Sequence, residues 1–503
     1  MKKNRFFWLK VILLFVVALG VYIINYSDSQ KAGKSNAAGA IYYVSQSGSS
    51  SNPGTSSDAP TVFSRVSNGG IPLNPGDKVL FKKGDTFSGH LQITYSGVDG
   101  NPIIYGSYGE SGAAPILENS GGQWSHPITL LASYVVVQDL HLQNAGDAGI
   151  CIDSCSSGRS GTASHNLIQN LEINNTGTGL RVYGHDNRIT NNKIHDLKMI
   201  VNTSGGDDDW GATGIFLYNG NNEVDNNYFY NCKAASYDYG YDGGAIEIAA
   251  KEFSADNLNI HHNISKDNKG FMEIGGNGGA ETANNVIVAY NLIVNDGRMI
   301  GTHLSGGFSV NLGGMRIENN TFVGSQSAIV FWGGSATPQT LSMSNNIFSG
   351  FSGIAPSVSV RNNNLYTSDP GFDLESNDLV ADPLFANSSA GNYHLQSSSP
   401  AINAGTLLSY TFDLDDKQIV GLPDLGAYEY GSSGGATPTP IPTTPPGHKT
   451  GDVNNDGKVN IVDIGILIDN YAQQVEPGSE MDLDNNGIIN IIDIGIIIDH
   501  YEL

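Results

Sequence analysis

The sequence predicts a mainly β protein whose short strands wind into successive coils of a parallel β-helix, followed by a small α-helical domain. Two observations lead to this prediction. An asparagine-centred pattern recurs every 26 to 36 residues through the middle of the chain, and a twelve-residue loop pattern occurs twice near its C-terminal end. We therefore divide the chain into residues 1–40, the coils at 41–430, a Gly/Ser/Pro/Thr linker at 431–448, and 449–503.

Residues 1–40 are expected to direct export. Three basic residues lie within Met1–Arg5, and Phe6–Ile24 is apolar except for Lys10. The uncharged run from Val11 would span about 21 Å as a helix, less than the roughly 30 Å of a bilayer core. We expect an extracellular or cell-surface protein, with the segment either cleaved as a signal peptide or kept as a membrane-anchoring transmembrane helix.

Composition excludes two classes of protein. The net charge is −24 and no basic stripe is present, which argues against nucleic acid as a partner. Three cysteines are too few for a disulfide scaffold. Cys151 and Cys155 either form a local bridge or remain buried thiols like Cys232.

The repeated pattern has an apolar residue, two variable residues, Asn, one variable residue and a second apolar residue. Between the asparagines lie short apolar alternations broken by Gly, Asn and Asp, without a long helical stripe, which is typical of β-helix coils. Asn suits a coil corner because it tolerates the left-handed conformation and its amide can bond to the next Asn in the stack. We predict a structural ladder of Asn192, Asn227, Asn263, Asn291, Asn320 and Asn346, the third copy carrying its next apolar residue, Ile264, one place early.

Segments at both ends of the coils resemble secreted right-handed parallel β-helix proteins of the pectate-lyase-like superfamily. This resemblance implies a right-handed β-helix. It leaves the reaction open, because the superfamily includes lyases, glycoside hydrolases, epimerases and non-catalytic surface proteins. The segments are Ile41–Gly48, Asn52–Thr55, Pro75–Phe81 and Asn101–Tyr105 at the start, and Ser399–Gly405 and Pro423–Tyr430 at the end.

Two adjacent coils, between Asn192 and Asn227 and between Asn227 and Asn263, are longer than the others. Their extra residues are acids and aromatics, which suit a carbohydrate site because aromatic faces stack on sugar rings. The alternative is a solvated loop without a site. The predicted polysaccharide-binding residues are Trp210, Tyr237, Tyr239, Tyr241, Asp208, His303 and Arg298.

A pair of glutamates is the predicted catalytic centre. Aligning Gly244 with Gly270 places Glu247 over Glu273 on the next coil, and strand alternation turns both outward. Strands about 4.8 Å apart would bring the carboxyl groups near the roughly 5 Å separation of a retaining glycosidase. Repulsion would raise one pKa, giving an acid beside a nucleophile. We expect hydrolysis of O-glycosyl bonds, with Asp242 as a third catalytic carboxylate; alternatively, the pair shares a cation or binds a glycan without cleaving it.

The second hypothesis is a polysaccharide lyase. It would require a base to remove the proton beside a uronate carboxylate, and calcium to neutralise that carboxylate. Bases are available at Arg298, Arg316, Lys251 and Lys233, and Asp207–Asp209 with Asp242 would provide a calcium site in the cleft. Hydrolysis is preferred because no basic residue occupies the aligned glutamate positions. A non-catalytic glycan-binding or surface protein is the third hypothesis.

The duplicated loop near the C-terminus matches an EF-hand-like calcium loop. Oxygen side chains fall at positions 1, 3, 5, 9 and 12 with glycine at 6, a spacing that places them around one calcium ion. An amphipathic stripe follows each loop, and no helix precedes it. The predicted ligands are Asp452, Asn454, Asp456, Asn460 and Asp463 in the first copy, and Asp482, Asp484, Asn486, Asn490 and Asp493 in the second.

This arrangement resembles the type I dockerin, which attaches extracellular enzymes to cohesin modules. The resemblance implies two calcium ions, with the backbone carbonyls of Lys458 and Ile488 as additional ligands. It also implies contact with a cohesin-like receptor through Ile461-Val462 and Ile491-Ile492. The alternative is an acidic surface tail.

Overall fold

The computed structural model describes residues 39–431, apart from 68, 157–158, 251, 277–280, 304–312, 333–340 and 355–359, and four isolated residues beyond them. The chain divides into two compact units, Met1–Ser433 and Gly434–Leu503. The predicted signal or anchor segment lies outside the described residues except for its last two positions. Where the structure is described, no helix has the length and apolar character to cross a bilayer.

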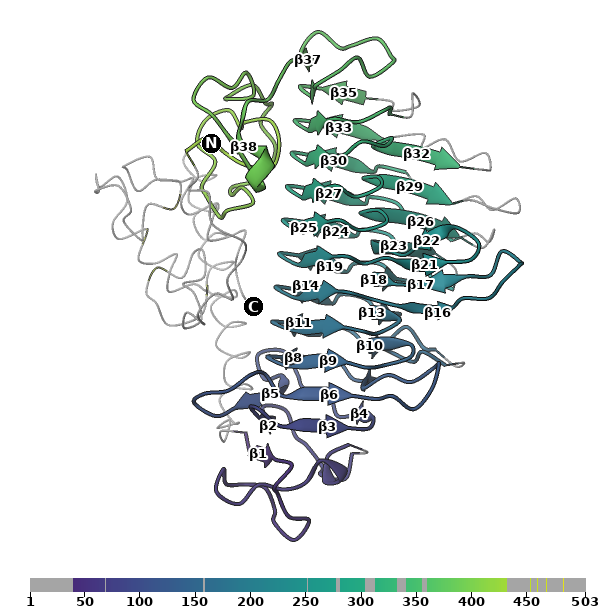
Figure 1. The fold of residues 1–503 in the computed structure, drawn as a ribbon. Helices are drawn as coiled ribbons and strands as arrows, with labels where there is room; N and C mark the ends of the chain where they lie inside the picture. The colour runs from purple at the N-terminus through teal and green to yellow at the C-terminus, as the bar shows by residue number, and fades with distance from the viewer. Residues whose placement is uncertain are drawn as a thin grey trace, which may run out of the picture. The chain divides into compact units, whose positions relative to one another are not determined.

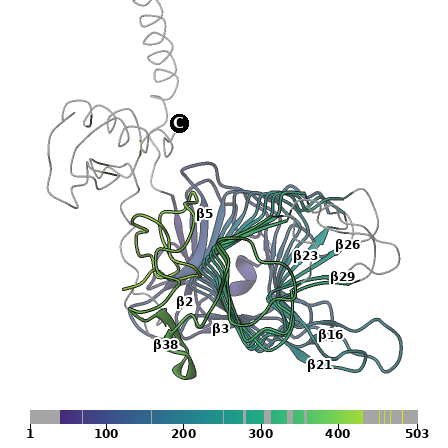
Figure 2. The same cartoon turned by 90° about the horizontal axis from the view of Figure 1, so that it is seen from above.

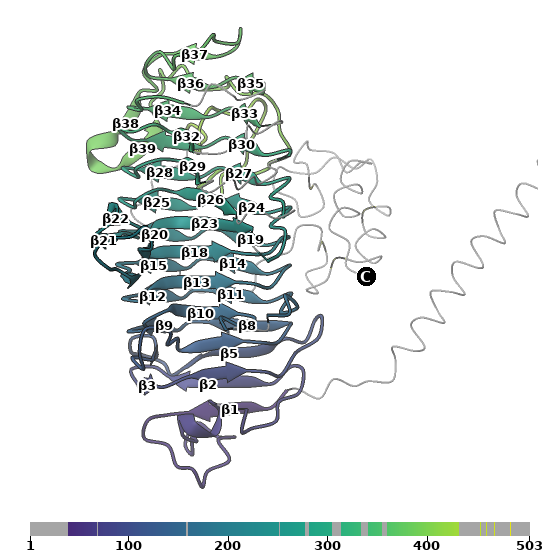
Figure 3. The ribbon, with the colours of Figure 1, turned by 90° about the vertical axis from the view of Figure 1, so that its right-hand side faces the viewer.

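The first unit is a parallel β-helix (Figures 1 and 3). Within the described residues, its strands form three long parallel sheets of twelve, nine and twelve strands, which confirms the predicted parallel β-helix. The first sheet contains β1 (Ile41–Val44), β2 (Lys78–Lys82), β5 (Ile103–Tyr108), β8 (Val135–Gln138), β11 (Leu167–Gln169), β14 (Arg188–Thr190), β19 (Glu223–Asp225), β24 (Asn259–His261), β27 (Ile287–Ala289), β30 (Arg316–Glu318), β33 (Ser342–Ser344) and β35 (Val360–Asn362).

The second sheet carries the residues of functional interest. It contains β4 (Leu91–Ile93), β7 (Ile128–Leu130), β10 (Ala148–Ile152), β13 (Thr178–Val182), β18 (Thr213–Leu217), β23 (Gly244–Ala250), β26 (Met272–Gly276), β29 (Ile300–His303) and β32 (Ile329–Trp332). The third sheet contains β3 (Thr86–Ser88), β6 (Ile116–Glu118), β9 (His141–Gln143), β12 (Glu172–Asn174), β15 (Lys193–His195), β20 (Tyr228–Tyr230), β25 (Ile264–Lys266), β28 (Leu292–Val294), β31 (Thr321–Val323), β34 (Ile347–Ser349), β36 (Leu365–Tyr366) and β37 (Leu379–Val380).

A typical coil takes one strand from the first, third and second sheets in that order, as in β11, β12 and β13. Figure 2, viewed along the stack, shows the three sheets enclosing an elongated core. Inward-facing apolar side chains repeat on every coil and form one continuous cluster, in which residues such as Ile173, Ile194 and Phe229 are 0% exposed. Stacking therefore buries the apolar face that a single coil would expose.

The predicted asparagine ladder lies at the corner between the first and third sheets. Side-chain amides link Asn192 to Asn227, Asn227 to Asn263 and so on to Asn364 at 2.9–3.1 Å, and Asn364 bonds to Asp378. One detail of the prediction was wrong: the left-handed residue is the one before each ladder asparagine, such as Asn191 (φ 55°). The residue before each ladder asparagine therefore turns the chain, and the ladder asparagine itself forms the hydrogen bonds along the stack.

The irregular third copy also joins the ladder, since Asn263 is 0% exposed and bonds to Asn291. The change falls on the following strand, β25, where Ile264 is half-buried and Ser265 takes the inward position. The Ser265 hydroxyl donates to the carboxylate of Asp296. A polar residue is thus accommodated in the core because it has a hydrogen-bond partner.

The last part of the first unit folds back beside the stack. It includes the hairpin β38 (Phe385–Asn387) and β39 (Asn392–Leu395), with the 3-10 turn η2 (Ser388–Ala390) between them; a second 3-10 turn, η1 (Phe63–Arg65), lies near the N-terminal end. Tyr393 and Tyr428 pack with Leu292 and Val294 of β28. This segment covers apolar side chains on the outer face of the third sheet.

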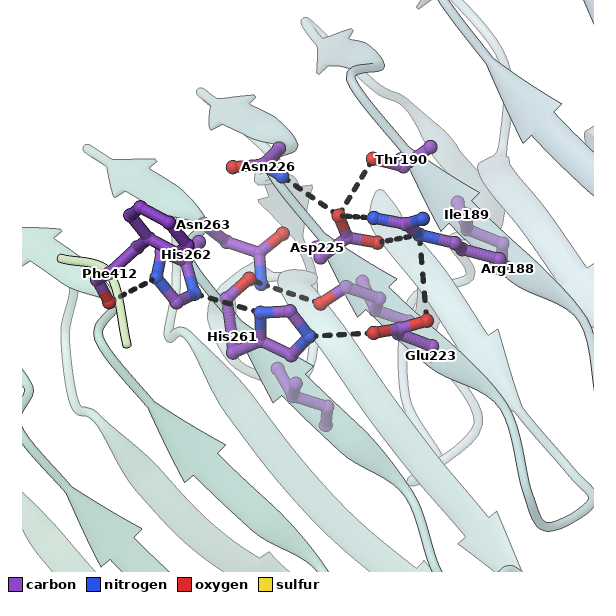
Figure 4. Close-up of polar contacts among 12 residues, drawn as sticks. Arg188, Ile189, Thr190, Glu223, Asp225, Asn226, His261, His262, Asn263 and Phe412 are labelled. Atoms are coloured by element: carbon purple, nitrogen blue, oxygen red, sulfur yellow. Dashed lines mark hydrogen bonds and ion pairs between the residues drawn. The ribbon is translucent and has the colours of Figure 1, made fainter. Parts of the chain in front are cut away.

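Outward-facing polar residues connect neighbouring coils on the first sheet (Figure 4). The guanidinium of Arg188 donates two hydrogen bonds to Asp225 at 2.8 and 2.9 Å, and His261 Nε2 bonds with Glu223 at 2.9 Å. His262 Nε2 donates to the carbonyl of Phe412 at 3.2 Å. Every charged group in this network has a partner, so we interpret it as structural.

Cys151 and Cys155 form a disulfide, which decides between the two alternatives left open by the sequence. Cys232 is a buried free thiol. In the second unit, only Val453, Val459, Leu467 and Leu483 are described. All twelve predicted calcium ligands and both predicted receptor contacts lie outside the described residues.

Candidate functional site

Glu247 and Glu273 lie side by side on adjacent strands. The parallel register pairs Glu247 of β23 with Glu273 of β26, as the alignment predicts. Both are half-buried, whereas the residues flanking them (Ile246, Ile248, Met272 and Ile274) are at most 1% exposed. Strand alternation therefore turns both glutamates away from the core.

Two cationic side chains border Glu273. Lys269 and Arg298 line a small cavity with Glu273, Met272 and three glycines, Gly243, Gly244 and Gly270. Gly243 has a φ of 120°, and a Cβ there would lie 2.5 Å from the carbonyl oxygen of Ala212. A side chain at this position would collide with the backbone of Ala212 and Cys232, so only glycine fits it.

The cavity shifts the pKa of Lys269 downward. Burial is the main cause and the positive charge of Arg298 adds to it, while Asp242 and Glu273 oppose the shift. A lysine in this environment holds its proton less tightly than one in water. It therefore has the character needed of a general base.

Asp242 is influenced by the same charges. Its pKa is raised to about 6, first by burial and then by repulsion from Glu273 and Asp209, with Lys269 opposing the shift. The charge of Glu273 thus acts on Asp242, while their shared catalytic role stays a prediction. A carboxyl group with this pKa can act as a proton donor near neutral pH.

The two insertions form neighbouring hairpins (Figure 2). The first connects β16 (Met199–Val201) with β17 (Trp210–Gly211), and the second connects β21 (Ala234–Ser236) with β22 (Gly240–Asp242). Asn202 Nδ2 donates to the carbonyl of Ala235 at 3.0 Å, and the Asp208 amide donates to Asp238 at 3.0 Å. Three tyrosines of the second hairpin are exposed, at 69% for Tyr237, 42% for Tyr239 and 56% for Tyr241.

A group of three carboxylates lies where the hairpins meet. Oxygen atoms of Asp208, Asp209 and Asp238 fall within 4.8 Å of one another, a donor set that fits a hard cation such as calcium. This differs from the predicted cleft site of Asp207–Asp209 with Asp242. Asp207 instead accepts a hydrogen bond from the Tyr239 hydroxyl. Asp242 is close enough to Glu273 for the charge of Glu273 to raise its pKa.

Other predicted residues lie elsewhere. Trp210 packs against Phe216, with ring centroids 6.2 Å apart, rather than with the hairpin tyrosines. Arg316 is on the first sheet, 3.9 Å from Glu318, and is not on the sheet that carries the glutamate pair. Lys233 precedes β21 and is half-buried. Lys251 and the side chain of His303 lie outside the part that the structure describes.

A second hollow in the described part does not contain these groups. It measures about 620 Å³ and lies near the first hairpin, with a lining that includes Glu118, Asn144, Asn175 and Lys198. Glu118 is already bonded to Asn144 at 2.6 Å, and Asn144 to Asn175 at 2.7 Å. We place the site at Glu273 and Lys269 because basic side chains, an acidic side chain and three glycines line the same cavity there.

Sequence reasoning missed Lys269 and Asp238. Lys269 immediately precedes Gly270, the residue used to align the glutamates, so its position was available from that alignment. The sequence alone does not single it out, because the contact between the turn before β26 and the glutamate depends on packing. Asp238 lies among the acidic and aromatic extra residues of the second long coil, and only the packing of the two hairpins brings it to Asp208.

Two family matches define the class of this protein. Residues 128–348 match the family described as "Right handed beta helix region", and residues 450–500 match "Dockerin type I domain". The chain is therefore a right-handed parallel β-helix protein with a type I dockerin domain at its C-terminal end.

Individual relatives agree with this class. Pectate lyase L of Dickeya dadantii (strain 3937) is 32% identical over 163 residues, which cover 29% of this chain and 36% of that protein. Pectate lyase L of Dickeya chrysanthemi is 30% identical over 157 residues, with the same coverage. This chain thus spans about a third of the length of these relatives.

Among solved structures, the complex of XylC with xylose has a TM-score of 0.51 at 12% identity, covering 78% of this chain and 99% of that one. Pectate lyase Pel9A has a TM-score of 0.49 at 20% identity, covering 78% and 96%. At these identities the likeness to XylC concerns the fold alone.

Proposed function

We propose that this protein is an extracellular polysaccharide lyase that cleaves an anionic, uronate-containing polymer by β-elimination. The observation that carries this proposal is Lys269, a base with a lowered pKa, in a cavity shared with Arg298 and Glu273. The partial similarity to two proteins named pectate lyase L supports the same class. The aligned glutamates of the sequence favour hydrolysis, whereas the position of Lys269 beside Glu273 favours elimination.

The chain's own residues would perform the following steps. Neutral Lys269 takes the proton from the carbon next to the substrate carboxylate, and Arg298 holds that carboxylate by charge. The electron pair left behind forms a carbon–carbon double bond as the glycosidic bond at the neighbouring carbon breaks. The departing oxygen takes its proton from solvent water, so the elimination step does not require Asp242 in its protonated form.

The acidic group at the hairpins has a supporting role in this proposal. Asp208, Asp209 and Asp238 would hold calcium. When bound, calcium neutralises a substrate carboxylate. The exposed tyrosines of the second hairpin would stack on sugar rings beside the calcium ion.

Hydrolysis is the second candidate function. It is favoured by the register that pairs Glu247 with Glu273 and by the raised pKa of Asp242, which together offer a nucleophile and an acid. Incubation with a panel of acidic and neutral polysaccharides separates the two. Elimination predicts new reducing ends together with ultraviolet absorbance from the unsaturated product, whereas new reducing ends without that absorbance would reject elimination.

The dockerin domain defines the proposed partner. We infer that it binds a cohesin-like receptor in a calcium-dependent manner and so places the enzyme in a complex or on a surface. A pull-down with cohesin modules, with and without a chelator, tests this inference. Binding that survives chelation, or no binding to any cohesin class, would contradict it.

A further inference from the structure

The outward face of the second sheet changes abruptly between β18 and β23. The parallel register aligns one outward-facing residue per coil, in the order Thr129, Cys151, Arg181, Phe216, Glu247, Glu273. The first four are at most 7% exposed, although they point away from the core. Glu247 and Glu273 are half-buried, so the face is covered up to Phe216 and opens at Glu247.

A second layer of side chains covers the closed part. Tyr183 and Tyr218 stack on each other with ring centroids 4.1 Å apart, and Arg159 lies 4.2 Å above the ring of Tyr183. Arg159 also forms an ion pair with Glu252. Phe253 packs against the same aromatic cluster. Residues from the four segments that follow β10, β13, β18 and β23 thus cover this part of the sheet.

Buried charges hold this layer in place. Arg181 donates to Asp147 at 3.0 and 3.2 Å and to the Tyr183 hydroxyl at 2.6 Å. Its guanidinium also lies 5.4 Å from the ring of Trp210. Breaking a buried pair of this kind would leave an uncompensated charge, so the layer is not free to move aside for a ligand.

The covered part therefore forms a wall near the reacting groups. Phe216 and Glu273 are separated by two strand spacings, which is about 10 Å. Lys269 adjoins the Glu273 coil. The uncovered row from Phe216 to Glu273 is therefore about 10 Å long, and a polymer that runs along the coils past Lys269 would meet the covered part beyond that length.

Resting on the proposed function, we propose that the cleft is closed at this end and that the enzyme removes mono- or disaccharide units from one end of the polymer. Phe216, Trp210 and Arg181 form the end wall against which the terminal sugar stops. They determine product length and do not touch the reacting atoms.

Product size over time tests this proposal in the full-length protein. With polygalacturonate as the first substrate and alginate as the second, mono- and disaccharides should be the first products, and viscosity should fall only slowly as bonds are cut. An early mixture of long fragments with a rapid loss of viscosity would overturn the closed end while leaving elimination intact. Short products without ultraviolet absorbance would support the closed end and reject elimination.

Two variants test the wall itself. Trp210→Ala and Arg159→Ala should each release a share of trisaccharide or longer products, because each removes part of the covering layer. Tyr230→Ala removes an exposed tyrosine on the third sheet and should leave the product sizes unchanged. If the Trp210 and Arg159 variants are both folded by thermal melting yet give the wild-type product sizes, the assignment of the wall and its covering layer is wrong.

Discussion

Asp296 is a carboxylate in a position that asparagine occupies on the coil below. Its Oδ1 accepts a hydrogen bond from the backbone N–H of Asn268 at 2.9 Å. On the coil below, Oδ1 of Asn268 accepts one from the backbone N–H of Cys232. Asp296 is only 2% exposed, and burial raises its pKa to about 7. The folded protein therefore binds this proton more tightly than the unfolded chain, and the associated stability is lost as pH rises through about 7.

Asp296→Asn should consequently raise the melting temperature at about pH 8 and change it little at about pH 5. The amide keeps the acceptor for Asn268 and removes the buried charge. Thermal melts at both pH values provide the measurement, with Asp139→Asn, at a half-buried left-handed turn position of another coil, as the control. A larger gain at the acidic pH than at the basic one would contradict the assignment.

The pH dependence of activity follows from Lys269 and Asp242. Elimination needs Lys269 without its proton, so the rate should rise with pH until the pKa of Lys269, which lies below the ordinary lysine value, is passed. Hydrolysis would need a protonated carboxyl group, and with Asp242 at about 6 its rate should fall above that pH. Initial rates across the neutral and alkaline range distinguish the two; a fall above about pH 6 would favour hydrolysis.

At the scale of the element, the sequence predicted the coils well and the site only in part. The spaced asparagines reveal the ladder because each coil repeats the same local chemistry. The glutamate pair was found because one glycine alignment fixes a strand register. Lys269 and Asp238 were missed because turns and hairpins differ in length from coil to coil, and packing rather than periodicity determines what they contact.

Asn263→Ala tests the ladder. Asn263 is fully buried, accepts from the backbone and side chain of Asn227, and donates to Asn291 and to two backbone carbonyls. Its loss would leave several buried groups unpaired, each costing about 1–3 kcal/mol. Denaturant unfolding should show a loss of at least 2 kcal/mol by this estimate. Asn226→Gly, at the exposed left-handed corner position, should have a much smaller effect.

At the scale of the whole molecule, the two units should respond differently to calcium. The dockerin ligands are calcium-binding oxygens, so the ion stabilises that domain by binding its folded form. The β-helix is held together by a continuous apolar core that needs no ion. Calorimetry should therefore show a transition that a chelator removes and a second that persists; a single transition insensitive to chelation would contradict this division.

The central claim is that Lys269 is the base of an elimination reaction. The most direct test compares Lys269→Met with Glu247→Gln, measuring the initial rate of ultraviolet-absorbing product from an acidic polysaccharide. Loss of a general base should reduce the rate of the lysine variant by about 10²–10⁴-fold, whereas the glutamate variant should retain most of its activity. A lysine variant that keeps its rate, or a glutamate variant that alone abolishes bond cleavage, would contradict the claim.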